Sequence, residues 1–84
     1  MVRDPGRGLM LIGIVGRGAK RITRQLQGIP EVRAIQSTNG RWDLIVELGT
    51  ETLETLDLAL AKIRTFDGVV SSETNLLLST KKET

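Results

Sequence analysis

Three residue types are missing from this sequence of 84 residues: cysteine, histidine and tyrosine. Without cysteine, the chain can form neither a disulfide nor a thiolate metal site. Without histidine, it lacks the commonest metal ligand and the commonest general base, and it cannot build a Ser-His-Asp or Cys-His arrangement. We therefore expect a protein that is not an enzyme and that holds no metal and no cofactor.

Aromatic residues and long apolar runs are scarce as well. Trp42 and Phe66 are the only aromatics, too few for the base-stacking sheet of an RNA-recognition motif. No apolar run approaches the roughly 18 residues that cross a bilayer, and the first residues lack the apolar segment of a signal peptide. These absences predict a cytoplasmic protein that neither enters a membrane nor binds nucleic acid directly.

Acidic residues are scarce in one half of the chain and abundant in the other. Residues 1–41 contain eight basic and two acidic residues, a net charge of +6, whereas residues 42–84 contain four basic and eight acidic residues, a net charge of −4. A basic half can mark a nucleic-acid surface. We favour a solvated helix face with charge matching between subunits, because few aromatics are available to stack on bases.

The apolar residues that are present follow the spacing of strands and helices. Residues 9–15 are apolar at both odd and even positions, which point to opposite faces of a strand, and this is typical of a strand buried on both faces. A first helical stripe then ends before Pro30, and strands are expected over residues 32–38 and 41–48. A second helix follows, capped by Thr50 or Thr52. The two stripes consist of Ala19, Ile22, Leu26 and Ile29, and of Leu53, Leu56, Leu60 and Ile63.

The last predicted strand covers residues 69–79. We expect residues 1–8 to form a flexible head or linker remnant, residues 9–80 the folded domain and residues 81–84 a polar tail. A shift of 37 positions superposes the two helices, with Leu26 meeting Ile63. Two such β-α-β units predict an α+β fold, the ferredoxin-like βαββαβ sandwich, in which a four-stranded antiparallel sheet carries two helices on one face.

The sheet face away from the helices is predicted to be apolar too. Residues 9–15 and 76–78 are apolar apart from Gly13, and they belong to the first and last strands, which we expect at the centre of the sheet. A monomer would leave much of that surface in water, and large exposed apolar patches mark interfaces. The pattern predicts a homodimer that forms through the sheet, followed by higher assembly.

Two patterns are similar to enzyme sites. Residues 13–20 resemble a phosphate-binding loop between a strand and a helix, but Ala19 rather than lysine follows Gly18, and no serine or threonine follows Lys20. The glycines are wrongly spaced for a dinucleotide-binding fingerprint. Arg17 lies where an acylphosphatase-like loop would need an arginine, and this stays an alternative. Asp43 and Glu47 share a strand face, but a carboxylate pair without histidine, cysteine or tyrosine nearby is weak evidence for acid–base catalysis.

Residues 37–43, with the sequence Ser-Thr-Asn-Gly-Arg-Trp-Asp, connect the two middle strands. Asn39-Gly40 predicts a tight two-residue turn, because both residues tolerate positive φ. A ligand carboxylate would approach the backbone at Gly40, and Asp43 would accept from an α-ammonium group. Thr38 and Thr74 would add hydroxyls, and Trp42 a wall. In the alternative interpretation, Trp42 belongs to the core and Asp43 fixes the turn through backbone hydrogen bonds.

These residues also resemble a known family. Gly40-Arg41-Trp42-Asp43-Leu44 is similar to the Gly-x-Tyr-Asp-hydrophobic signature in the effector domain of the Lrp/AsnC transcriptional regulators, the regulation-of-amino-acid-metabolism domain. The segments 29–32, 66–69 and 72–74 fit that domain too, so the resemblance covers residues 9–82. The chain departs from the family at Asn39, Arg41 and Trp42, where the family often has threonine, an acidic residue and tyrosine.

The resemblance implies homodimers through the sheets, rings of dimers such as an octamer, and an amino-acid effector bound between dimers. Its effector-loop positions correspond to Thr38, Asn39, Gly40, Arg41, Trp42 and Asp43, and its threonine on the last strand to Thr74. The sequence has no helix-turn-helix before the first strand, so we expect a stand-alone or excised effector domain with a full-length regulator as a further partner. The alternatives are a purely structural assembly domain and an ACT-type domain, whose pocket usually lies at helix-side interfaces.

Overall fold

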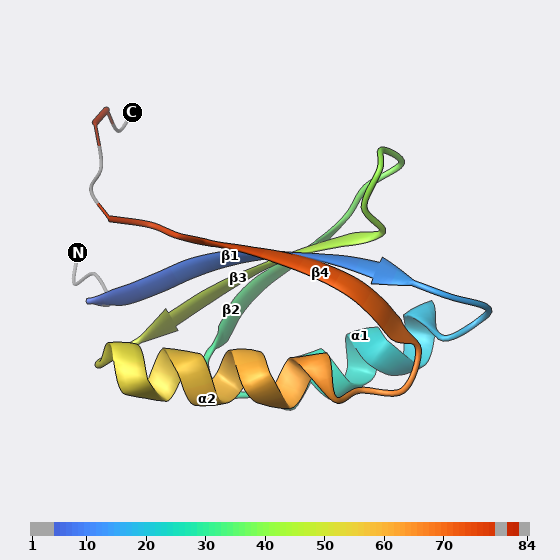
Figure 1. Cartoon of the computed structure of the whole chain (residues 1–84), viewed down its shortest axis with the longest axis horizontal. Helices are drawn as coiled ribbons and strands as arrows, with labels where there is room; N and C mark the ends of the chain where they lie inside the picture. Colours follow the sequence, from blue (N-terminus) through green and yellow to red (C-terminus); the bar gives the residue numbers. More distant parts are fainter. Residues whose placement is uncertain (1–4, 79–80, 83–84) are drawn as a thin grey trace.

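The computed structural model describes residues 5–78 and 81–82, and it has the predicted βαββαβ order. The elements are β1 (Gly6–Ile14), α1 (Ala19–Gln27), β2 (Val32–Ser37), β3 (Leu44–Thr50), α2 (Leu53–Arg64) and β4 (Val69–Leu76). All neighbouring strands pair antiparallel, and both helices cover one face of the sheet (Figure 1). The predicted ferredoxin-like α+β sandwich is therefore confirmed.

The strand order corrects one expectation. The sheet runs β2-β3-β1-β4, so β1 and β3 are central and β4 lies at an edge. We predicted β4 at the centre because its end is apolar. The two crossovers place β4 at the edge instead. Each β-α-β unit leaves room for one strand between its own two strands: β3 lies between β1 and β2, and β1 lies between β3 and β4.

Three strand boundaries differ from the sequence prediction by three residues, and the others by two residues or fewer. β1 begins at Gly6 rather than Leu9, because the backbones of Gly6 and Gly8 pair with Thr50 and Leu48 of β3. Strand pairing uses backbone groups, which hydrophobic patterning does not report. β3 begins at Leu44 rather than Arg41, and β4 ends at Leu76. The predicted strand end at residue 79 lies outside the described residues.

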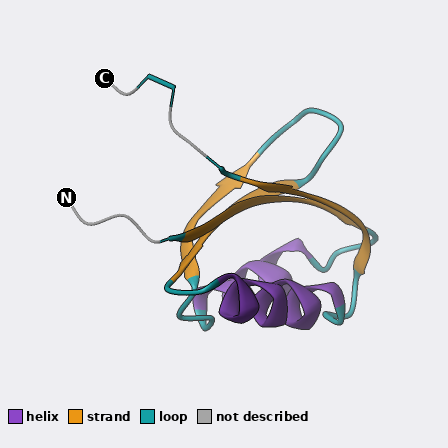
Figure 2. Ribbon diagram, turned by 60° about the vertical axis from the view of Figure 1, so that its left-hand side comes forward, coloured by secondary structure: helices purple, strands orange, loops and turns teal. Residues whose placement is uncertain are grey.

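The core lies between the sheet and the two helices (Figure 2). Both helices contribute from their predicted stripes, but Ala19 and Leu53 are exposed, because each is the first residue of its helix. The core comprises Met10, Ile12, Ile22, Leu26, Ile29, Leu44, Val46, Leu48, Leu56, Ala59, Leu60 and Ile63. Within the described residues, neither helix is long and apolar enough to cross a membrane.

The two helices begin differently. The side chain of Thr52 caps α2 by accepting a hydrogen bond from the backbone N–H of Thr55 at 3.1 Å, which confirms one of the two predicted caps. In contrast, α1 begins at Gly18 without a side-chain cap and without an acidic residue in its first turn. The positive end of the α1 dipole is therefore not balanced by its own sequence.

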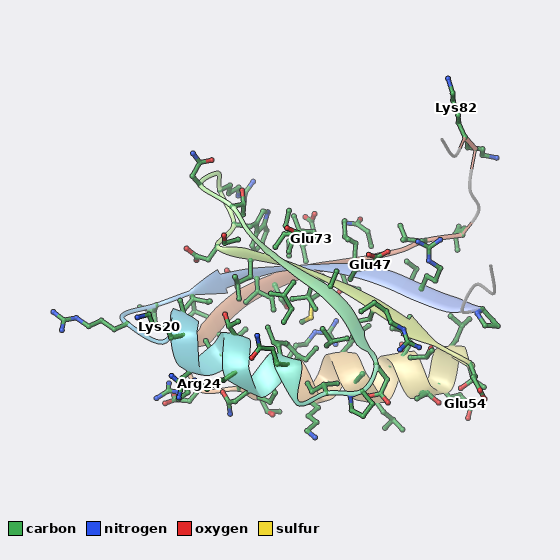
Figure 3. All side chains as sticks on the ribbon, turned by 180° about the vertical axis from the view of Figure 1, so that it is seen from behind. Lys20, Arg24, Glu47, Glu54, Glu73 and Lys82 are labelled. Carbon is green, nitrogen blue, oxygen red and sulfur yellow. The ribbon has the colours of Figure 1, made fainter. Side chains whose placement is uncertain are left out.

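The face of the sheet away from the helices combines an apolar centre with charged groups. Leu9, Leu11 and Ile45 are only partly buried there. Arg7 and Glu47 form an ion pair of 3.1 Å beside them, and Figure 3 shows Glu47 and Glu73 projecting from this face. Since β4 is an edge strand, Glu73 lies at the border of the face rather than at its centre. We call this surface the open face.

Candidate functional site

Residues 38–43 form a loop that projects beyond the sheet on the side away from the helices (Figures 1 and 2). The base of the loop is closed by the Thr38 N–H, which donates to the carbonyl oxygen of Asp43 at 3.2 Å. Positive φ angles occur in the described residues only at Gly16 and Gly68. The predicted two-residue Asn39-Gly40 turn, which needs positive φ at both residues, is therefore wrong.

Asp43 explains the wider loop, because it is also bonded to β1. Its backbone N–H donates to the carbonyl of Ile12 at 2.9 Å, and its carboxylate Oδ2 accepts from the N–H of Ile14 at 2.7 Å. The β1–β4 register shifts at Gly13 and Ile14, next to this contact. Bonds to an ionised acceptor are among the stronger hydrogen bonds in proteins. Asp43 therefore makes backbone hydrogen bonds, as the alternative interpretation expects, but they attach the loop to β1 rather than fixing a turn.

Only some of the polar groups in the loop form hydrogen bonds within the loop. The Gly40 N–H donates to Thr38 Oγ1 at 3.1 Å, so this N–H is already used and is not waiting for a ligand. A hydroxyl that accepts one hydrogen bond still has its own hydrogen to donate. Thr38 therefore keeps a donor for a small molecule. Asn39 at the tip is exposed.

Arg41 and Trp42 lie side by side on the loop. The guanidinium carbon of Arg41 is 5.7 Å from the centre of the Trp42 ring, which is within cation–π range. Trp42 is half-buried and is not part of the hydrophobic core, so its interpretation as a core residue is wrong. Together the two side chains present a cation and a large planar surface to solvent.

Thr74 is not brought to this loop within one subunit. It pairs with Met10, a buried residue of the helix-covered face, and its Oγ1 accepts from the Arg64 guanidinium of α2 at 3.2 Å. The structure thus gathers Thr38, Asn39, Gly40, Arg41, Trp42 and Asp43 into one loop and places Thr74 beside α2. Across the described residues, no group of three acidic side chains could hold a metal ion.

Sequence reasoning missed the two residues that hold the loop in place. Ile12 and Ile14 act through backbone groups, so their side-chain types carry no signal of this role. The clue that existed was Asp43 itself, which directly precedes a buried strand and therefore lies within reach of the neighbouring strand.

Comparison with known proteins decides the family. The profile of the Lrp/AsnC ligand binding domain matches residues 9–84. The chain belongs to this family. The match begins at the fourth residue of β1 and covers the rest of that strand, the other three strands, both helices and the whole loop of residues 38–43. A comparison with curated protein sequences gives no match.

Solved structures of similar proteins share the fold of this Lrp/AsnC domain. A hypothetical protein, PHS023 from Pyrococcus horikoshii, is 25% identical with a TM-score of 0.81, and the match covers 90% of this chain and 93% of that one. AsnC of E. coli is 19% identical with a TM-score of 0.87, and the match covers 96% of this chain and 56% of AsnC. A transcriptional regulator of Neisseria meningitidis, NMB0573, was solved as a complex with L-Met. It is 14% identical with a TM-score of 0.83, and the match covers 98% of this chain and 55% of NMB0573.

Proposed function

We propose that this chain is an amino-acid-binding assembly domain of a transcriptional regulator, either stand-alone or excised. Copies pair through the open face, assemble further, and bind an amino acid between them at the loop of residues 38–43. The observation that carries the proposal is the loop itself. Asp43 fixes its base on β1 through two hydrogen bonds, while the side chains of Arg41, Trp42 and Thr38 remain available on the loop.

The chemistry of the loop matches a free amino acid. The Arg41 guanidinium supplies a planar fork of donors for an α-carboxylate, and one oxygen of the exposed Asp43 carboxylate lies outside the Ile14 bond for an α-ammonium group. Trp42 gives an apolar wall for a side chain. A relative of the same fold was solved with L-Met, which supports the choice of ligand class.

A loop that projects into solvent encloses little volume by itself, whereas small-molecule sites usually bury most of their ligand. We therefore place the ligand between the loops of adjacent subunits, so that ligand binding and assembly are thermodynamically linked. Thr74 stays outside this proposed site, because its hydroxyl is bonded to Arg64 on the helix side.

Pairing through the open face follows from its composition. Leu9, Leu11 and Ile45 form a partly buried apolar strip along the two central strands, and the Arg7–Glu47 ion pair flanks it. A domain of this size gains little stability from its own core, so a second copy that covers the strip supplies apolar burial that the monomer lacks. The exposed Glu73 at the border can remain in contact with water.

The proposal is tested by titrating the protein with each of the twenty amino acids. Trp42 is the only tryptophan, so its fluorescence reports directly on the loop, and native mass spectrometry gives the assembly state in the same samples. We expect at least one amino acid to change both signals. Arg41→Gln should weaken that binding about tenfold, the typical effect of losing one charge-assisted bond, while Arg24→Gln, at an exposed position of α1 outside the loop, should leave it unchanged.

Each other result has a defined meaning. Assembly without any response to millimolar amino acids would favour a purely structural assembly domain. Binding that ignores Arg41→Gln but depends on helix residues would favour an ACT-type site. A monomer of 9.2 kDa at micromolar concentration would refute pairing through the open face.

A further inference from the structure

A second feature lies at the end of the sheet where α1 begins and α2 ends. The β1–α1 and α2–β4 connections run side by side there (Figure 1), joined by a hydrogen bond of 3.0 Å from the Val15 N–H to the Gly68 carbonyl. Between them is an open cavity of about 660 Å³. Its lining includes Val15, Arg17, Arg21, Arg64, Asp67 and Val70. We call it the arginine cavity.

Positive charge dominates the arginine cavity. Three arginines are among its lining residues, against one acidic residue, Asp67. Arg21 donates to the backbone carbonyl of Asp67 at 3.1 Å and to its carboxylate at 3.4 Å, and Arg64 donates to Thr74. Each guanidinium carries five N–H donors in a fixed fork, so these bonds leave most of the donors for an anion.

The start of α1 adds to this field. Gly18 lies in the lining of the cavity and precedes the first helical residue, and the first turn of α1 holds no acidic side chain. The first N–H groups of a helix are unpaired within it and carry a partial positive charge. The helix end strengthens a site whose basis is the open cavity and its three arginines.

Apolar side chains form part of the remaining lining. Val15 is 59% exposed and Val70 is 64% exposed, although both are hydrophobic, and half-buried Phe66 also lines the cavity. A volume of about 660 Å³ falls within the range of sites for small molecules and far exceeds the need of one inorganic phosphate ion. The occupant therefore combines an anionic part with an apolar or planar part.

We propose that the arginine cavity binds a phosphorylated small molecule of nucleotide size. Its phosphate groups contact Arg17, Arg21 and Arg64, and its base lies against Val15 and Val70. The proposal concerns binding alone, without any reaction of the phosphate. It is independent of the amino-acid site, because the cavity shares no residue with the loop of residues 38–43.

The test titrates the full chain with ATP, with pyrophosphate and with inorganic phosphate, and follows the backbone amide signals of Gly16, Gly18 and Gly68 by NMR. These glycines belong to the two connections that border the cavity, whereas Trp42 fluorescence reports on the loop. We expect ATP and pyrophosphate to shift the glycine signals, with ATP the tighter ligand. Arg17→Gln should weaken ATP binding about tenfold.

Arg24→Gln is the matched control, since Arg24 is an exposed arginine of α1 outside the cavity lining. It should leave ATP binding within about twofold, because a residue outside the lining adds only a general attraction through solvent and no direct hydrogen bond to the phosphates. Equal weakening by both variants would indicate diffuse attraction and overturn the proposal. So would glycine signals that do not move with ATP, or that move with duplex DNA alone. Far-ultraviolet circular dichroism confirms that each variant is folded.

Discussion

The two β-α-β halves of this domain pack alike and begin their helices in opposite ways. Leu26 of α1 and Ile63 of α2 occupy equivalent positions, and both are fully buried. At the helix start, however, α2 has the Thr52 cap and Glu54, and it ends with Lys62 and Arg64. α1 has an uncapped glycine and no acidic residue in its first turn.

This difference shows where the chain departs from local helix chemistry. Packing is maintained in both halves because a small core has no surplus stability. Capping and charge at a helix start each contribute about 1 kcal/mol or less, so a protein can omit them at one helix. Departures from local rules tend to occur at functional sites, and here the uncapped start of α1 borders the arginine cavity.

The shared packing is tested by truncating the equivalent core residues. Leu26→Ala and Ile63→Ala should each lower the free energy of unfolding by about 2–5 kcal/mol, because each leaves a cavity among fully buried side chains. Urea denaturation measures both. A cost below about 1 kcal/mol for either variant would show that its half is not held by the common core.

The loop of residues 38–43 joins the two halves and is anchored on β1 of the first half through Asp43. Asp43→Ala should lower stability by about 1–2 kcal/mol, since the Ile14 N–H loses a charged acceptor. Hydrogen exchange at the Ile14 amide should accelerate in this variant. Asp57→Ala, an exposed aspartate in the middle of α2, serves as the control and should leave that amide unchanged. Unaltered exchange at Ile14 in Asp43→Ala would contradict the described bond.

Substitution by alanine at the two helix starts should change the stability of the domain in opposite directions. Thr52→Ala should destabilise by about 1 kcal/mol, because it removes the side-chain cap. Gly18→Ala should stabilise by about 0.4–1 kcal/mol, since Gly18 has φ of −82°, and an added Cβ meets only ordinary contacts. Thermal unfolding of the two variants compares them directly. Destabilisation by both would show that α1 depends on Gly18 in a way that its geometry does not reveal.

Charge at the start of α1 should give the smallest change in stability. Ala19→Glu places an acidic side chain in a first turn that has none, which should stabilise by about 0.3–1 kcal/mol at low salt through the helix dipole. The gain should disappear at high salt because the groups are exposed. The same variant should weaken ATP binding at the arginine cavity. A salt-independent gain would point to a cause other than charge.

Much of the fold could be predicted because it depends on side-chain spacing. The stripes at Ile22 and Leu26 and at Leu56, Leu60 and Ile63 predicted both helices, and Thr52 was one of two predicted caps. The edge position of β4 could not be predicted from its apolar end. It depends on how two crossovers interleave, which is a property of the whole sheet.

The candidate site was predicted in position but not in shape. The Asn39-Gly40 pair correctly indicated a reversal between β2 and β3. Its dihedral angles were predicted wrongly because Asp43 bonds to a strand 29 residues earlier in the chain, and a local pattern cannot anticipate such a contact. The arginine cavity brings Arg17 and Arg21 together with Arg64, which lies in the other half of the sequence.

The position of β1 has a mechanical consequence. β1 enters the sheet at the end where β4 leaves it, and its nine residues extend roughly 30 Å at ~3.3 Å per residue to the bond between Ile14 and Asp43. The central strand β1 therefore connects the base of the loop to the opposite end of the domain. Because β1 is hydrogen-bonded to β3 on one side and to β4 on the other, we expect the base of the loop to move together with the sheet as one body.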